Sequence, residues 1–173
     1  SFVFSDIVIN CPKNGRADTL LTAKKLSLTI NTFNLLDGSD TINNCIIENG
    51  SFFHYPKIID SLARYFTANS KDSSSVNIFL NKFIIKNYYL NIYNEVDRQI
   101  FHTYINNALV NLNIKGNYTF LYFKGNVENF NSENLSFLGY PANIEGKISR
   151  LDNKYQIDKL NIKYNSVVVD SEG

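Results

Sequence analysis

The sequence predicts a mainly β protein: an antiparallel meander sheet with one short α-helix near residues 57–66. Apolar residues recur at every second position over most of the 173 residues, which is the period of strands with one buried face. Pairs of turn-forming residues separate these runs at short intervals, as they do between neighbouring antiparallel strands. The apolar period changes to that of a helix in one place only.

Alternation predicts two strands near the start of the chain. The first covers 2–9, and a polar stretch over 12–18 that contains Asn14-Gly15 predicts the turn after it. The second covers 25–31, where Leu26, Leu28 and Ile30 alternate with polar residues.

A short helical turn and two further strands are expected over 32–55. Thr32 is suited to cap a turn over 33–36, which Asp37-Gly38 would end. A strand follows over 42–48. Asn49-Gly50 then predicts a tight hairpin turn into a strand over 51–55, because both residues tolerate positive φ.

The predicted helix covers 57–66. Ile58, Ile59, Leu62, Tyr65 and Phe66 draw one apolar stripe along it, and the preceding Pro56 is suited to a helix start. The polar, small residues of 67–75 predict a loop.

The remainder of the chain shows strand patterns alone. A one-residue shift near Asn81-Lys82 predicts a β-bulge, and the charged segment 95–98 predicts a turn. Further turn signals occur at 115–117, 124–126, 139–141 and 152–153. We therefore expect one β-rich segment over 1–173, with a mixed strand and helix subregion at 1–66, a loop at 67–75 and an all-strand meander at 76–173.

Composition excludes several function classes. The chain has 17 basic and 16 acidic residues and a formal charge of +1, so it offers no field that would attract nucleic acid. It contains no run of about 18 apolar residues that would span a bilayer. It also contains no Met, from which we expect a segment of a longer protein. Asparagine is abundant, and base composition with turn chemistry is the favoured explanation.

The sequence contains no group of residues that indicates a catalytic or metal site. His54 and His102 each lie alone in a strand pattern, where histidine is usually structural, and no metal-ligand spacing surrounds them. Cys11 and Cys45 either form a disulfide or remain small buried hydrophobes, and the apolar pattern around Cys45 favours the second alternative. No phosphate-binding loop or nucleophile elbow occurs. We therefore expect no enzyme activity, no metal and no cofactor.

Several short motifs resemble the AsmA-like family of Gram-negative envelope proteins, which are related to TamB and the bridge-like lipid transfer proteins. These motifs are Ser5-Asp6-Ile7-Val8-Ile9, the segment 18–28, Phe33-Asn34-Leu35-Leu36-Asp37-Gly38, and the strand 42–48 with Asn49-Gly50. Later motifs are Phe83-Ile84-Ile85-Lys86-Asn87, Leu90-Asn91-Ile92-Tyr93-Asn94, Asn107-Ala108-Leu109 and the segment 155–169.

The resemblance implies a sheet that curves into a trough with an apolar lining. It also implies a periplasmic segment, anchored in the inner membrane through a missing N-terminal helix, that binds or conducts phospholipid or another lipid for envelope maintenance. On this interpretation, one face of successive strands provides the lipid-binding residues. They are Leu26, Leu28, Ile30, Ile78, Leu80, Leu90, Ile92, Val110, Leu112 and Ile162.

Two alternatives remain open. A secreted β-sandwich that binds glycan or protein would seal two sheets face to face and place exposed Tyr and Asn residues on loops. A hydrolase with a hidden carboxylate pair would hold two acids within about 10 Å of each other in a cleft.

Overall fold

The computed structural model describes residues 1–13, 16–30, 40–55, 77–94, 96, 98–115, 118–132, 136–137, 140–151 and 154–172. Every regular element among these residues is a β-strand, which confirms the mainly β, mostly antiparallel prediction. The expected helix at 57–66, the helical turn at 33–36, the Asn14-Gly15 turn and the loop at 67–75 lie outside the described residues.

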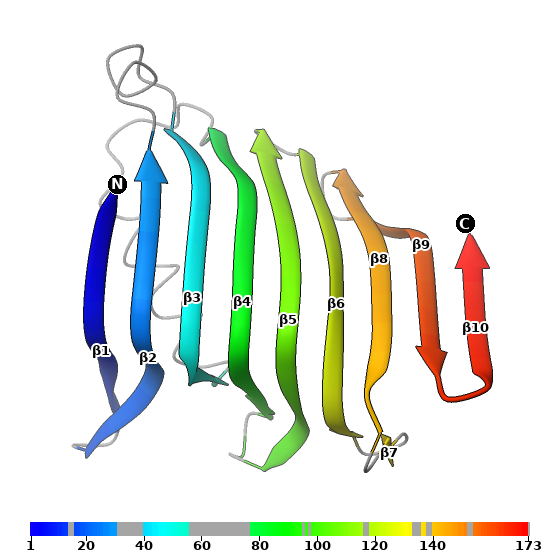
Figure 1. Ribbon diagram of the computed structural model, residues 1–173, viewed down its shortest axis with the longest axis horizontal. Helices are drawn as coiled ribbons and strands as arrows, with labels where there is room; N and C mark the ends of the chain where they lie inside the picture. Colours follow the sequence, from blue (N-terminus) through cyan, green and yellow to red (C-terminus); the bar gives the residue numbers. More distant parts are fainter. Residues whose placement is uncertain are drawn as a thin grey trace.

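Ten strands form one open sheet (Figure 1). They are β1 Phe2–Lys13, β2 Arg16–Ile30, β3 Asp40–His54, β4 Asn77–Tyr93, β5 Gln99–Lys115, β6 Tyr118–Ser132, β7 Ser136–Phe137, β8 Ala142–Leu151, β9 Lys154–Tyr164 and β10 Val167–Glu172. The spatial order is β1-β2-β3-β4-β5-β6-β8-β9-β10, and the short β7 pairs with the end of β6.

Apart from the short β7, chain neighbours are sheet neighbours, as a meander requires, but one pair departs from the antiparallel rule. β3 and β4 are parallel, with Asp40 opposite Ile78 and His54 opposite Ile92. The two strands therefore start at the same end of the sheet. The sequence did not predict this parallel pair.

Two predicted turns are wrong. Asn49-Gly50 lies inside β3, and Gly125, at the centre of the predicted 124–126 turn, lies inside β6. Asn49 has a φ of 55°, so the tolerance for positive φ that suggested a hairpin is used within a strand. Gly125 is opposite Ala108, whose side chain leaves no room for a Cβ at this position.

Two other local predictions are confirmed. The register between β4 and β5 shifts between Leu80 and Phe83, which places a bulge at Asn81-Lys82. The turn before β5 is closed by Asn94, whose Oδ1 accepts hydrogen bonds from the backbone N–H groups of Val96 and Arg98 at 3.0 and 2.9 Å.

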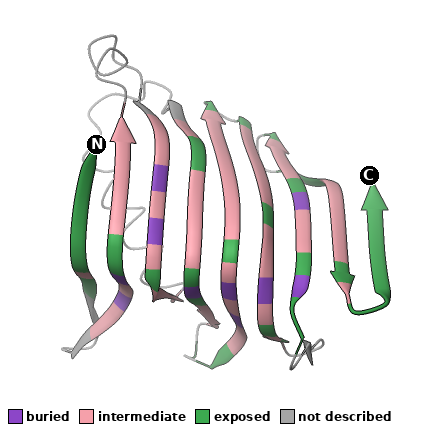
Figure 2. Ribbon diagram, viewed as in Figure 1, coloured by how far each residue is buried: buried purple, intermediate pink, exposed green. Residues whose placement is uncertain are grey.

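One face of the sheet is apolar, and the other, called the polar face, carries the charged side chains together with a few apolar ones such as Ile46, Ile84 and Leu109. A cluster of buried residues crosses the sheet on the apolar face, with one member in each of six strands: Ala23, Ile47, Tyr88, Ile105, Val127 and Ala142. Half-buried apolar side chains pack around it. Most residues of the central strands are only partly buried, and the outer strands β1 and β10 are exposed (Figure 2).

Five neighbouring strands each contain one extra residue at the same level of the sheet, and these are called the matched additional residues. The row Ser5, Lys25, Glu48, Lys86, Asn107, Asn126, Asn143 and the row Ile7, Ala23, Gly50, Tyr88, Ile105, Val127, Ala142 are adjacent across the sheet. Between the two rows, β1 to β5 each contain one residue more than β6 and β8. These additional residues are Asp6, Lys24, Asn49, Asn87 and Asn106. Asp6, Asn49 and Asn87 have φ between 51° and 55°, so the strands accommodate the addition as bulges.

Candidate functional site

The predicted lining residues share one face of the sheet. Seven of them, among them Leu26, Val110 and Ile162, lie in three rows of paired residues that cross the strands on the face of the buried cluster. One row contains Leu26, Ile47, Ile85, Ala108, Gly125, Ile144 and Ile162. The next contains Leu28, Cys45, Phe83, Val110, Phe123, Gly146 and Leu160. A third contains Ile30, Ile42, Leu80, Leu112, Leu121 and Ile148.

The remaining three predicted residues lie on β4. Leu90 packs against the buried cluster, and Ile92 is two residues further along the strand and therefore on the same face. The backbone of Ile78 pairs with Asp40 and Ile114, and its side chain is outside the described part. All nine lining residues with described side chains are half-buried. The face is thus neither closed like an ordinary core nor fully open to water.

Tyr88 is the centre of the apolar face. Its side chain is 4% exposed, and its hydroxyl donates hydrogen bonds to the carbonyl oxygens of Thr22 at 2.8 Å and Ser51 at 3.2 Å. Burial raises the pKa of Tyr88 to about 12. The ring passes over Gly50, where a Cβ would collide with the Thr22 carbonyl oxygen and come within 2.8 Å of the ring. Gly50 is therefore required for Tyr88 to reach these carbonyls.

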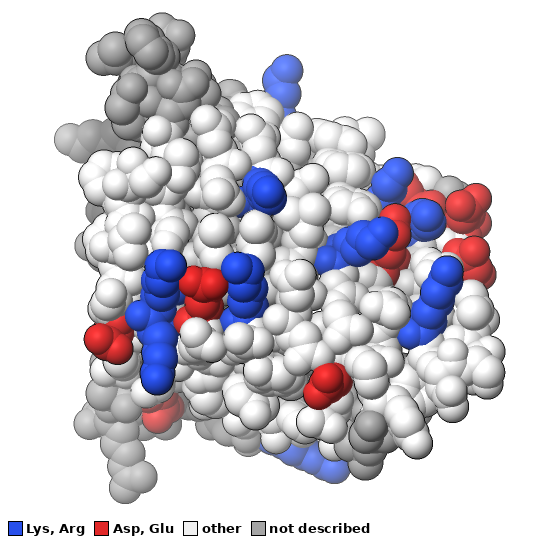
Figure 3. Space-filling model, viewed as in Figure 1, with Lys and Arg blue, Asp and Glu red and all other residues white. Residues whose placement is uncertain are grey.

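The opposite face carries the charged side chains (Figure 3). Glu48 lies between Lys25 and Lys86, at 3.3 Å from each ammonium group. Glu145 lies between Lys124 at 3.2 Å and Lys159 at 3.6 Å. Hydrogen bonding from Lys86 lowers the pKa of Glu48, and hydrogen bonding from Lys124 lowers the pKa of Glu145. Both carboxylates therefore stay ionised and paired at neutral pH.

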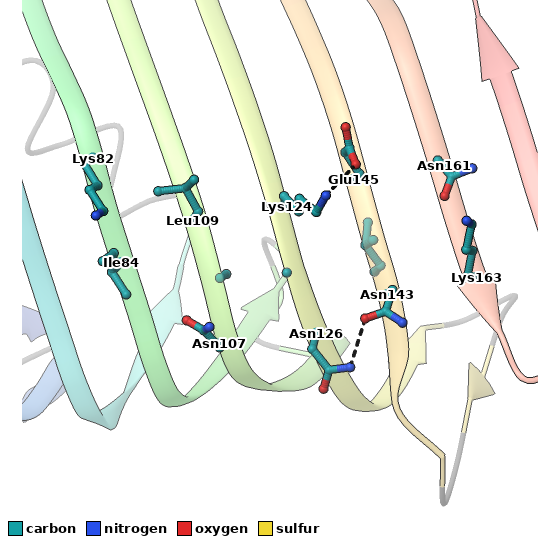
Figure 4. A pocket seen from close by; sticks show the side chains of 13 residues that line it. Lys82, Ile84, Asn107, Leu109, Lys124, Asn126, Asn143, Glu145, Asn161 and Lys163 are labelled. Carbon is teal, nitrogen blue, oxygen red and sulfur yellow. Dashed lines mark hydrogen bonds and ion pairs between the residues drawn. The ribbon is translucent and has the colours of Figure 1, made fainter.

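A shallow depression of about 580 Å³ lies on this polar face, over β4, β5, β6, β8 and β9 (Figure 4). Asparagines from four neighbouring strands line it: Asn107, Asn126, Asn143 and Asn161. Asn126 accepts a hydrogen bond from Asn106 at 2.8 Å and donates one to Asn143 at 3.2 Å. Lys82 and Lys163 lie toward its two sides.

The described residues offer little for redox or metal chemistry. Cys45 is a free, buried thiol, and burial raises its pKa to about 11. His54 lies next to the ring of Phe52, at 6.4 Å between ring centroids. Within the described ranges no group of three or more His, Cys, Asp or Glu side chains could hold a metal ion.

The described strands define a class of fold: one open, mostly antiparallel, amphipathic β-sheet. No protein-family model matches this chain, and no curated protein matches it significantly. No helix of the described part is long and apolar enough to cross a membrane.

Sequence reasoning missed the polar depression. The four lining asparagines were attributed to base composition and turns, yet all four lie inside strands, and none has a positive φ. Asparagine is depleted in strands, so its recurrence at strand positions was the available signal.

Proposed function

We propose that this chain is a non-enzymatic lipid-binding segment that holds acyl chains along the apolar face of its sheet. The observation that carries the proposal is the continuity of this face. Rows of aliphatic and aromatic side chains cross the strands from β2 to β9, and those of the predicted lining remain half-buried. A protein without a ligand normally closes such a surface into a core, because large apolar patches are costly in water.

The dimensions suit an acyl chain. The seven neighbouring strands from β2 to β9 have six spacings, which at about 4.8 Å each give an apolar face about 29 Å wide. Removal of each methylene from water contributes about 0.8 kcal/mol, so partial cover of a long chain already stabilises the complex. Shape and area are sufficient for this function, and it needs no catalytic group.

The AsmA-like resemblance extends the proposal to the cell. We propose that the sheet curves into a trough, lies in the periplasm and is held at the inner membrane by a preceding anchor in the full-length protein. Phospholipid or another lipid is then the partner, and envelope maintenance is the role. A fusion of alkaline phosphatase to the full-length protein would be active if this part lies in the periplasm and inactive if it lies in the cytoplasm.

The β-sandwich alternative receives less support. It needs a second sheet against the first, whereas all ten described strands belong to one sheet.

Photo-crosslinking from two adjacent positions tests the lipid proposal. Leu112 lies on the apolar face, and its neighbour Asn111 is on the opposite face of β5. A benzoylphenylalanine at position 112 should crosslink to the acyl chain of a phospholipid added in mixed micelles, and the same group at position 111 should not. Equal labelling at both positions, or none at either in a folded protein, would overturn the proposal.

A further inference from the structure

The polar face carries a second site that the lipid proposal does not use. Its central row is Asn107, Asn126 and Asn143, which lie opposite one another on β5, β6 and β8, and Lys163 continues the row on β9. Neighbouring strands are about 4.8 Å apart, so the row presents a polar group at each of these steps. An amide offers two donors and one acceptor, which is the combination that hydroxyl groups require.

Local backbone geometry does not account for these asparagines. Asn49, Asn87 and Asn129 have φ between 51° and 55°, which explains their presence, because asparagine tolerates the left-handed region. The lining asparagines have no such φ. They occupy ordinary strand positions, where threonine or valine would be the more favourable residue.

Two of the four asparagine side chains in the depression are available for hydrogen bonds to a ligand. Asn126 and Asn143 are joined to each other, which fixes the orientation of both amides. Asn107 and Asn161 form no side-chain hydrogen bond to the described residues. The depression therefore combines two fixed amides with two available ones.

The charge of the depression is positive on balance. Glu145 is the acidic residue of the lining, and it is already shared between Lys124 and Lys159. Lys82 and Lys163 form no ion pair with any described residue. They lie on β4 and β9, which are four strand spacings or about 19 Å apart, so one small anion cannot contact both.

An exposed aromatic pair lies on the same face. Tyr89 and Tyr104 are opposite each other on β4 and β5, with ring centroids 4.7 Å apart, and Tyr89 is 51% exposed. Glu128, the partner of Tyr104 in β6, accepts a hydrogen bond from Asn106 at 2.6 Å, and Asn106 also contacts Asn126. The side chains of Glu128, Asn106 and Asn126 thus form one hydrogen-bonded network, and the aromatic pair lies on the far side of the asparagine row from Lys82.

From these observations we propose that the depression binds a linear acidic oligosaccharide that lies across the strands. Its hydroxyl groups contact the asparagines, and its carboxylates contact Lys82 and Lys163. The ligand must be elongated because the two lysines are far apart, and it must be rich in hydroxyl groups because Asn107, Asn126, Asn143 and Asn161 line the depression. This site is on the opposite face from the lipid surface, so either proposal can fail alone.

Calorimetric titration with tetragalacturonate tests the proposal, and the neutral cellotetraose and monomeric galacturonate serve as ligand controls. We expect tetragalacturonate to bind more tightly than either control. Substitutions Lys82→Ala and Lys163→Ala should each weaken binding about fivefold, as loss of one exposed ion pair would. Lys115→Ala removes an exposed lysine at the end of β5 and should leave the affinity unchanged.

The asparagine row has its own matched pair of variants. Asn161→Ala should weaken binding, whereas Asn10→Ala, at an exposed strand position on β1, should not. Asn161 is partly buried and Asn10 is exposed. Urea unfolding would verify that both variants remain folded.

Several outcomes would overturn the proposal. These are no binding of tetragalacturonate to the folded protein, equal affinity for inorganic phosphate, or binding to anionic phosphatidylglycerol vesicles without binding to the oligosaccharide. An equal loss in the Lys115→Ala and Lys163→Ala proteins would do the same, since it would indicate attraction by net charge alone.

Discussion

Tyr88 shows how one side chain can link three strands of a sheet. Its ring fills the centre of the apolar face, while its hydroxyl reaches the backbone of β2 and β3. The contact exists because Gly50 leaves space beneath the ring. Tyr88 shares its face with Leu90, which the sequence predicted as a lining residue. The contact with Gly50 could not be predicted, because it depends on a parallel pairing between segments 38 residues apart.

Tyr88 should make the stability of the fold depend on alkaline pH. The folded pKa is about 12, above the ordinary value of 10.0. Below pH 10 both states keep the proton, and the full stability is present. Between pH 10 and 12 the unfolded chain loses its proton first, so stability falls as the pH rises.

The variant Tyr88→Phe tests this dependence through urea unfolding at several pH values. We expect it to be less stable at pH 8 by about 0.5–1.5 kcal/mol, through loss of the hydroxyl contacts, and to show a weaker decline from pH 10 to 12. Tyr118→Phe, at a tyrosine that is 41% exposed, is the control. Parallel pH curves for wild type and Tyr88→Phe would contradict the assignment.

At the scale of the strands, the matched additional residues decide which side chain reaches which face. Glu48 and Asn49 are consecutive, yet neither belongs to the apolar face, whereas Ile47 and Gly50 on either side do. If side chains alternated strictly along β3, either Glu48 or Asn49 would point to the apolar face. The observed faces therefore depend on the bulges as much as on the apolar pattern.

The bulge at Asn87 should be sensitive to the loss of asparagine. The left-handed region costs a residue with a Cβ about 1–2 kcal/mol, and asparagine offsets part of this through local hydrogen bonds that alanine cannot form. Asn87→Ala should therefore lower the free energy of unfolding by up to about 1–2 kcal/mol. Asn87→Gly keeps the conformation accessible and loses only the hydrogen bond to Asn49, so its effect should be smaller.

Asn131→Ala is the matched control for the Asn87 variants, since Asn131 is an exposed strand asparagine without positive φ. We expect its effect to stay within about 0.5 kcal/mol. Urea unfolding measures all three variants. Equal losses in Asn87→Ala and Asn131→Ala would show that the left-handed conformation carries no cost here.

The success of the strand predictions also has a physical limit. Alternation identified the common face of Leu26, Leu80 and Leu112, because each lies in a regular stretch between bulges. It also located the bulge at Asn81-Lys82, where the phase of the pattern changes. Asn49-Gly50 was misassigned, because one dipeptide is compatible with both a hairpin turn and a bulge, and long-range pairing decides between them.

At the scale of the molecule, each outer strand has one edge with no partner strand among the described residues, and it carries exposed apolar side chains. Phe2, Val3 and Val8 on β1 are 58%, 62% and 58% exposed, and Val167, Val168 and Val169 on β10 are 55%, 58% and 50% exposed. Such edges are templates for a further strand. We expect the isolated chain to self-associate through them as its concentration rises.

Val168→Lys should suppress this self-association at a small cost in stability, because a charge on an edge strand opposes the addition of a further strand, while Lys163 lies directly opposite residue 168. Light scattering over a concentration series measures the effect. Val96→Lys adds the same charge in the β4–β5 turn, at a residue that is 80% exposed, and should leave association unchanged. Equal suppression by both variants would attribute the effect to net charge instead of the edge.

The matched additional residues of β1 to β5 also restrict how this chain can evolve. Deletion of Asp6 alone would leave β1 one residue short against β2, and every side chain beyond it would exchange faces. A shortening that preserves both surfaces has to remove Asp6, Lys24, Asn49, Asn87 and Asn106 together. We therefore expect single-codon losses to be selected against inside these strands, and changes in length to be tolerated mainly in the connections between them.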